Sequence, residues 1–147
     1  MKYMFASDIH GSAYYCRKML DAYKEEQADR LILLGDLLYH GPRNDLPKDY
    51  APKQVIQMLN EVKEQLYVVR GNNDKEWAEK IPLTLTVTLE GVTFYLVHKK
   101  ADVPKDLTGV DVVVFGHSHK LSMEEKDGVL WLNPGSCGPR RFHQPIT

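Results

Sequence analysis

Cysteine is scarce in this sequence, and the two that occur, Cys16 and Cys137, lie far apart along the chain. Neither belongs to a Cys-x-x-Cys pair, so the sequence indicates neither a disulfide framework nor a zinc site with sulfur ligands. We expect two reduced thiols whose role is packing.

The chain also lacks a long apolar run and an excess of charge of either sign. No apolar stretch approaches the roughly 20 residues that span a bilayer. The N-terminus, MKYMFASD, meets an acidic residue too early for a signal peptide. The formal net charge is -1 and the basic residues are spread along the chain, which argues against a membrane or a nucleic acid as partner. We expect a cytoplasmic protein.

The first half of the chain alternates strand-like apolar runs with helical periodicity. Ser12 is a candidate N-cap, and Cys16, Leu20 and Tyr23 recur after it at helical spacing. A second helix is expected from Pro52, because proline suits the first helical turn. The strands expected here are residues 3–6, 31–34 and 66–69, and residues 37–51 are expected to form a long loop.

The second half predicts hairpins, with tight turns at Glu90-Gly91 and Asp127-Gly128. The expected strands are residues 83–89, 92–97, 112–115, 121–126 and 129–133. No repeat or low-complexity linker divides the chain, and 147 residues can bury one continuous core. We therefore predict a single domain over residues 1–147 with a mixed α/β (α+β) fold, a two-sheet β-sandwich flanked by helices.

Polar residues that can bind metals follow the ends of the expected strands. They are Asp8, His10, Asp36, Asn72, His98, His117 and His119. Because ligands bind beyond the carboxyl ends of strands in open α/β sheets, we expect all seven to meet at one rim. Carboxylate, amide oxygen and imidazole suit manganese, iron, nickel or zinc better than calcium. A single Asp-x-His or Gly-Asp pair is usually a capped turn or a surface pair, so the prediction depends on the whole set.

Five blocks in this order resemble the calcineurin-like metallophosphoesterase family, and especially its small bacterial phosphodiesterases. The blocks are Asp8-Ile9-His10, Gly35-Asp36, Gly71-Asn72-Asn73-Asp74, His98 and Gly116-His117-Ser118-His119, and the likeness covers residues 1 to about 136. The resemblance implies a four-layer αββα arrangement and a metal-dependent phosphodiesterase that acts on a small phosphate ester.

The resemblance also implies a role for each candidate ligand. Asp8, His10, Asp36 and His119 would hold one ion, and Asp36, Asn72, His98 and His117 would hold the other. Asp36 would bridge two divalent ions, with Mn²⁺ expected first and Fe, Ni or Zn as alternatives. Two ions about 3.5 to 4 Å apart need such a shared anionic ligand, and they can lower the pKa of a bridging water so that the hydroxide attacks phosphorus in line. Asp36 and Asn72 are thus also candidate catalytic residues.

The sequence departs from the family pattern at three places. Asn73 stands where many members have a histidine thought to help the leaving group depart. An amide cannot donate a proton as an acid, so His40 is a candidate proton donor instead. Lys99 and Lys100 follow His98, where relatives have glycine and histidine; they either add positive charge beside the site or are simply solvated. Relatives continue past residue 147 into a final hairpin, so the domain could lack it and expose an edge that a homo-oligomer would cover.

Two alternatives come from other functional classes. The first is a protein-binding scaffold with weak or no catalysis, as in the retromer subunits of this family, because a fold does not fix a function. The second is a nuclease, which the near-neutral charge and the lack of an aromatic-basic groove disfavour.

Overall fold

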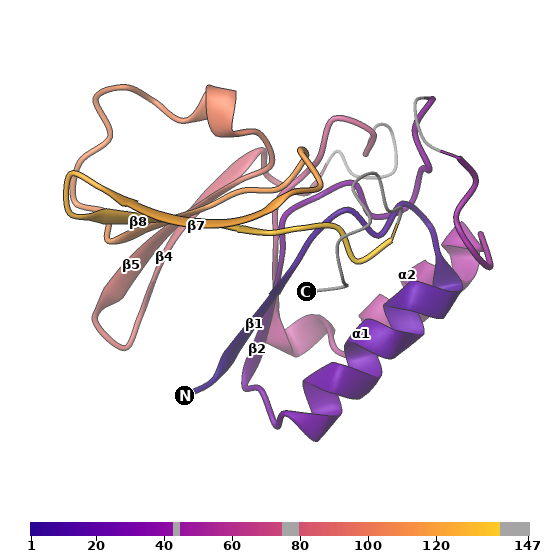
Figure 1. Cartoon of the computed structure of the whole chain (residues 1–147). Coiled ribbons are helices and arrows are strands. Elements are labelled where there is room, and N and C mark those ends of the chain that lie inside the picture. Colours follow the sequence, from indigo (N-terminus) through magenta and orange to yellow (C-terminus); the bar gives the residue numbers. More distant parts are fainter. Residues whose placement is uncertain (43–44, 75–79, 139–147) are drawn as a thin grey trace.

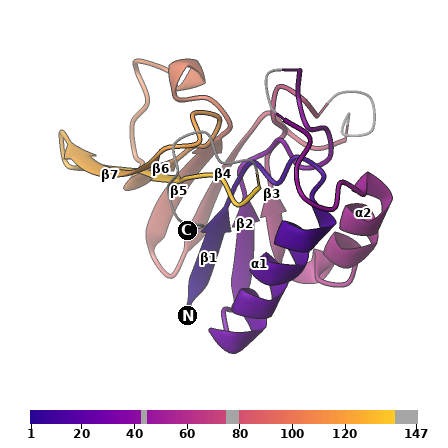
Figure 2. The same ribbon diagram turned by 45° about the vertical axis from the view of Figure 1, so that its right-hand side comes forward.

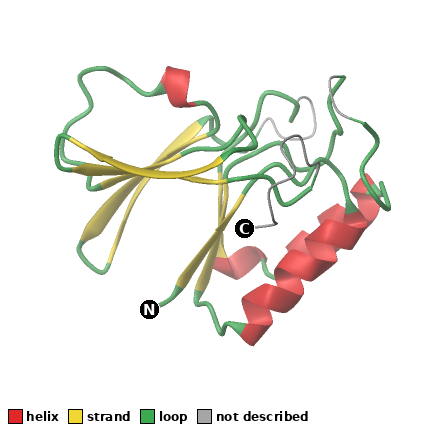
Figure 3. Ribbon diagram, viewed as in Figure 1, coloured by secondary structure: helices red, strands yellow, loops and turns green. Residues whose placement is uncertain are grey.

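The computed structural model describes residues 1–42, 45–74 and 80–138 (Figure 1). Two α-helices and eight strands make up the described fold, together with two 3₁₀ turns, η1 and η3 (Figure 3). In chain order they are β1 Tyr3–Ala6, α1 Ala13–Glu25, β2 Arg30–Leu33, α2 Pro52–Asn60, η1 Lys63–Gln65, β3 Leu66–Val68, β4 Thr84–Leu89, β5 Val92–Val97, η3 Lys100–Asp102, β6 Val112–Val114, β7 Leu121–Lys126 and β8 Val129–Pro134.

The first sheet is parallel, with strand order β1-β2-β3. Helices α1 and α2 cover one of its faces (Figures 1 and 2). The Ser12 side chain caps α1 by accepting a hydrogen bond from the backbone N–H of Tyr15. The helix then buries Cys16 and Leu20 against Leu31 and Leu33 of β2. The predicted alternation of strands and helices is confirmed.

The second sheet has the order β4-β5-β6-β8-β7. Its outer pairs, β4–β5 and β7–β8, are the two predicted antiparallel hairpins, while β5–β6 and β6–β8 are parallel. Its inner face packs on the first sheet, where Phe94, Leu96 and Val114 meet Ile32 and Leu34 in a common apolar core. The expected β-sandwich is therefore present.

The outer face of the second sheet has its own apolar cluster. Tyr95, Val113 and Phe115 pack there with Val103 and Leu107, which belong to the connection between β5 and β6. Among the described residues this connection holds only the short η3, so the fourth layer is a loop with a 3₁₀ turn in place of a long helix. The fold class is confirmed, with one thin outer layer.

Both thiols lie in the core beneath the helices, as expected. Cys16 and Cys137 are free and buried in the same cluster, and burial raises the pKa of Cys16 to about 12. These thiols are unreactive packing groups. None of the described helices combines the length and apolarity needed to cross a membrane.

Candidate metal centre

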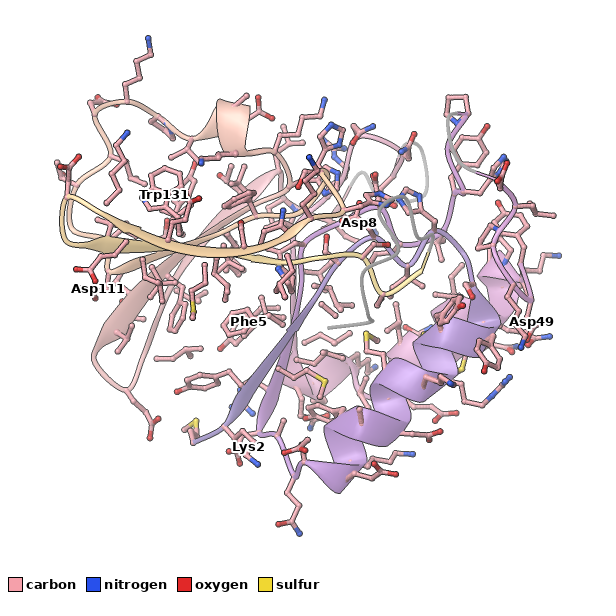
Figure 4. All side chains as sticks on the ribbon, in the orientation of Figure 1. Lys2, Phe5, Asp8, Asp49, Asp111 and Trp131 are labelled. Carbon is pink, nitrogen blue, oxygen red and sulfur yellow. The ribbon has the colours of Figure 1, made fainter. Side chains whose placement is uncertain are left out.

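The expected rim exists, because the loops that follow β1, β2, β3, β5 and β6 meet at one edge of the sandwich. Figure 4 shows Asp8 beyond the end of β1, at the place where the loops of both sheets come together. Six of the seven predicted ligands form two groups of three, each with ligand atoms within 4.8 Å of one another; these groups are Asp8, His10 and His119, and Asp36, His98 and His117.

The first group is fully buried and tightly spaced. Asp8 Oδ1 lies 3.4 Å from His10 Nε2 and 3.3 Å from His119 Nε2. The two Nε2 atoms are 3.2 Å apart. Three potential ligand atoms therefore point at one small space.

The second group lies beside the first and is more open. His98 Nε2 is 3.2 Å from Asp36 Oδ2, and the His117 Nδ1–H donates to Asn72 Oδ1 at 2.9 Å, which brings in the seventh predicted ligand. Asp36 Oδ2 is also 3.7 Å from His10 Nε2 of the first group. Asp36 is therefore the residue between the two groups.

The histidine orientations favour a cation. His10 donates its Nδ1–H to the Tyr39 carbonyl at 2.8 Å, and His98 donates its Nδ1–H to the Leu34 carbonyl at 2.6 Å. These bonds leave the Nε2 lone pairs facing carboxylate oxygens, which are also acceptors. Asp8 Oδ1 and His98 Nε2 are buried without a hydrogen-bond partner. Once the imidazoles are deprotonated, these buried groups are converging acceptors, an arrangement that fits a divalent ion.

The charges of the two groups support one another. Burial opposes ionisation of Asp8, but the adjacent His10 and His119 hold its pKa well below the usual range. Burial would lower the pKa of His98, but the Asp36 carboxylate raises it to about 8. Burial together with the positive charges of His98 and Lys99 lowers the pKa of His117. Lys99 therefore lies close enough to influence His117, and its effect on a substrate stays a prediction.

The backbone at these positions adopts a conformation that side chains seldom take. Nine described non-glycine residues have positive φ angles. Five of the nine are candidate ligands, namely Asp8, His10, Asp36, His117 and His119. Such backbone strain persists only where the surrounding structure enforces it, and it concentrates at functional sites.

Several supporting residues were missed by the sequence analysis. Ser7 Oγ and the His117 N–H donate to Asp8 Oδ2, and Ser136 Oγ donates to the Asp8 carbonyl. Asn73 donates to Asp36 from both its backbone N–H and its side-chain amide, at 2.8 and 3.0 Å. The sequence pattern indicated only that this residue cannot act as an acid. The side chains of such short polar residues give no signal in the sequence until the loops are placed.

Asp74 is a further supporting residue that the sequence did not single out. It is buried, and its carboxylate accepts hydrogen bonds from the N–H groups of Leu37 and Gly71, at 2.8 and 2.9 Å. It therefore links the loop that carries Asp36 to the loop that carries Asn72. Its position directly after Asn72 and Asn73 was the only available hint.

His40 lies outside both groups. Its ring makes edge contacts with Tyr39 and Tyr50, with centroids 4.8 and 5.4 Å away. His40 directly follows Tyr39, the residue whose carbonyl orients His10. The structure thus places His40 against Tyr39 and Tyr50 in the long loop, and its catalytic role stays a prediction.

Comparison with known proteins gives consistent results. The model of the calcineurin-like phosphoesterase superfamily domain matches residues 1–147. The chain is 41% identical to phosphodiesterase YfcE of Escherichia coli, over all of this chain and 85% of that protein. The solved structure of the E. coli phosphoesterase Yfce superposes with a TM-score of 0.90 at 37% identity, over 99% of this chain and 85% of that one.

More distant relatives are similar over most of their length. Phosphodiesterase MJ0936 of Methanocaldococcus jannaschii is 26% identical over 93% of this chain and 84% of its own. Vps29 of Entamoeba histolytica, solved in complex with zinc, shares the fold with a TM-score of 0.66 at 21% identity, over 92% of this chain and 74% of that one. With the whole chain matched by the family model, the protein belongs to the calcineurin-like phosphoesterase superfamily.

Proposed function

We propose that this protein is a phosphodiesterase that uses two divalent metal ions to hydrolyse a small phosphate ester. The observation that carries the proposal is the buried meeting of Asp8 Oδ1, His10 Nε2 and His119 Nε2 beside Asp36 and His98. Two relatives over most of the chain are phosphodiesterases by name. The proposal treats residues 1–147 as a single domain.

The arrangement supports a specific division of ligands. Asp8, His10 and His119 would hold one ion and Asn72, His98 and His117 the other, with Asp36 shared because it lies within 3.7 Å of His10 and 3.2 Å of His98. The donor set of carboxylate, imidazole and amide oxygen favours Mn²⁺, with Fe, Ni or Zn as alternatives. When bound, such a pair lowers the pKa of a water and neutralises charge on phosphoryl oxygens.

The chain's own groups prepare this site. The Tyr39 and Leu34 carbonyls fix the tautomers of His10 and His98, and Asn73 holds both oxygens of Asp36. Lys99 adds positive charge where an anionic substrate would bind. His40 is the proposed proton donor to the leaving group, supported by its place next to Tyr39 at the margin of the centre.

Two wider aspects of the proposal concern location and assembly. Two buried free thiols are consistent with the reducing cytoplasm.

Strand β7 is an edge of the second sheet, and its Leu121 and Met123 are 47% and 71% exposed. Such an edge could pair two copies of the chain into a homo-oligomer.

The direct test is hydrolysis of bis(p-nitrophenyl) phosphate by chelator-treated protein before and after addition of Mn²⁺. We expect activity only after the metal is restored. A panel of phosphate monoesters and diesters run in parallel would define the preferred ester. Inactivity with every metal and every ester would contradict the proposal.

That outcome would favour the scaffold alternative, which the shared fold of Vps29 keeps open. A scaffold has no chemical need for buried acceptors that face one another, and this observation favours the enzyme. The nuclease alternative predicts cleavage of single- or double-stranded DNA, which the same preparation would test.

A further inference from the structure

A second concave site lies away from the metal centre, on the outer face of the second sheet. It is a cavity of about 590 Å³ between the β5–β6 connection and strands β6 and β8. Its apolar lining includes Val103, Leu107, Val110, Val113, Val129 and Trp131. Figure 4 shows the Trp131 side chain on the side of β8 that faces this connection. The volume falls within the range of small-molecule sites, about 300 to 1,000 Å³.

The charged residues around this cavity are mainly basic. Lys100, Lys105 and Lys126 line it, against a single acidic residue, Asp127. Within residues 1–42, 45–74 and 80–138, none of the three ammonium groups makes an ion pair. Lys100 Nζ stands 5.5 Å from the centroid of the Trp131 ring and 5.6 Å from that of Phe115. A positive charge is therefore held directly over the aromatic part of the lining.

We propose that this cavity binds a small aromatic anion, with its flat apolar body against Trp131 and its carboxylate, sulfonate or phosphate group near the lysines. A cation would be repelled by Lys100, Lys105 and Lys126. A neutral apolar molecule would use the lining and gain nothing from the lysines. Only an amphipathic anion matches both parts of the site, because the charged pairs add to the apolar burial.

The site is separate from the proposed phosphodiesterase reaction and does not depend on it. The two are nevertheless connected through the chain: Lys100 comes two residues after His98, and Phe115 two residues before His117. Binding can be measured on metal-free protein, so the two proposals can fail independently.

The first experiment titrates the full chain with anilinonaphthalenesulfonate, a flat aromatic anion, and records proton–nitrogen correlation spectra. The sequence has two tryptophans, so Trp77→Phe assigns the indole N–H of Trp131. We expect a saturable shift of the Trp131 indole and the Gly109 amide, together with a rise in dye emission. Resonances of α1 residues should stay in place.

The second experiment tests the charges. The double variant Lys105→Gln, Lys126→Gln should bind the dye about three- to tenfold more weakly, as expected for two partly exposed ion pairs. Its affinity for phenylnaphthylamine, which has the same rings without the sulfonate, should not change. Lys53→Gln, an exposed lysine of α2, is the matched control and should bind both probes normally.

Three results would overturn the proposal. The first is the absence of a saturable shift at Trp131. The second is an equal effect of the double variant and Lys53→Gln, or an equal loss for the charged and neutral probes. The third is a Trp131 resonance that moves with protein concentration without any probe, because the cavity would then be an interface between two copies of the chain.

Discussion

Asp36 is the residue proposed to serve both halves of the centre. Asn73 donates to both of its oxygens, and Oδ2 still lies within 3.2 Å of His98 and 3.7 Å of His10. Its Oδ2 thus lies close to imidazole nitrogens of both groups of candidate ligands. Its charge is therefore the group that would offset the repulsion between two cations.

Replacement of this charge tests the shared role. Asp36→Asn should lower activity by more than about 100-fold, since even an outer partner of a metal ligand is worth about 10- to 100-fold. Bound metal should fall at the same time, as measured by elemental analysis. Asp106→Asn, an exposed aspartate, is the control. Normal activity and metal content in Asp36→Asn would refute the bridging role.

His40 offers a test of proton donation. His40→Ala should reduce turnover of aryl phosphodiesters more as the leaving group becomes poorer, because a poor leaving group needs the proton most. Metal content should be unchanged, since His40 lies in neither ligand group. A loss of equal size across the leaving-group series would exclude His40 as the donor.

The histidine pKa values predict how metal binding depends on pH. Asp36 raises the pKa of His98 to about 8, and a metal must displace any proton on this imidazole. Below that pH the proton competes, so the association constant for Mn²⁺ should fall by about tenfold or more per pH unit. Competition with a chromophoric chelator over a pH series that brackets 8 would measure it. An affinity that stays constant with pH would contradict the assignment of His98 as a ligand.

At the level of elements, the loops of the first sheet are tied together by Asp74. Its carboxylate accepts from the N–H groups of Leu37 and Gly71, which flank Asp36 and Asn72 in the chain. The two loops follow different strands, β2 and β3, so this side chain links them together with the Asn73–Asp36 hydrogen bonds. We expect it to act on the metal centre through geometry alone.

Asp74→Asn removes the charge and one of the two acceptor oxygens. Hydrogen bonds to a charged group contribute about 1.5 to 3 kcal/mol, so the free energy of unfolding should drop by about 2 kcal/mol in urea titrations. Mn²⁺ affinity should fall by about tenfold. Asp106→Asn again serves as the control, and unchanged stability with unchanged affinity would show that Asp74 does not tie the loops.

The elements themselves were predictable, and the reason is periodicity. Every expected strand is present with boundaries that agree within one residue, and both helices begin where expected, because unbroken apolar runs such as 31–34 suit a strand buried on both faces. The connection between β5 and β6, which forms the layer over Trp131, was not predictable. A segment with little regular structure shows no hydrophobic periodicity in its sequence. The positive φ of Asp8 and His117 was equally hidden, because the surrounding loops impose it.

At the scale of the whole molecule, the sandwich brings together side chains that are distant in sequence. The apolar core between the sheets fixes β2 against β5 and β6, and the exits of these strands then meet at one rim (Figure 2). Asp8 and His119 are more than a hundred residues apart in the chain and lie within 3.3 Å. The metal centre is therefore a property of the complete fold, and no single loop could form it.

The measurement that tests this account most directly is the number of Mn²⁺ ions that chelator-treated protein takes up per chain. Two converging groups, with Asp36 proposed as the shared ligand, predict two ions per chain, with uptake reduced in Asp8→Ala and in Asp36→Asn. No stoichiometric uptake of Mn²⁺, Fe, Ni or Zn, or uptake that both variants leave unchanged, would contradict the existence of the centre.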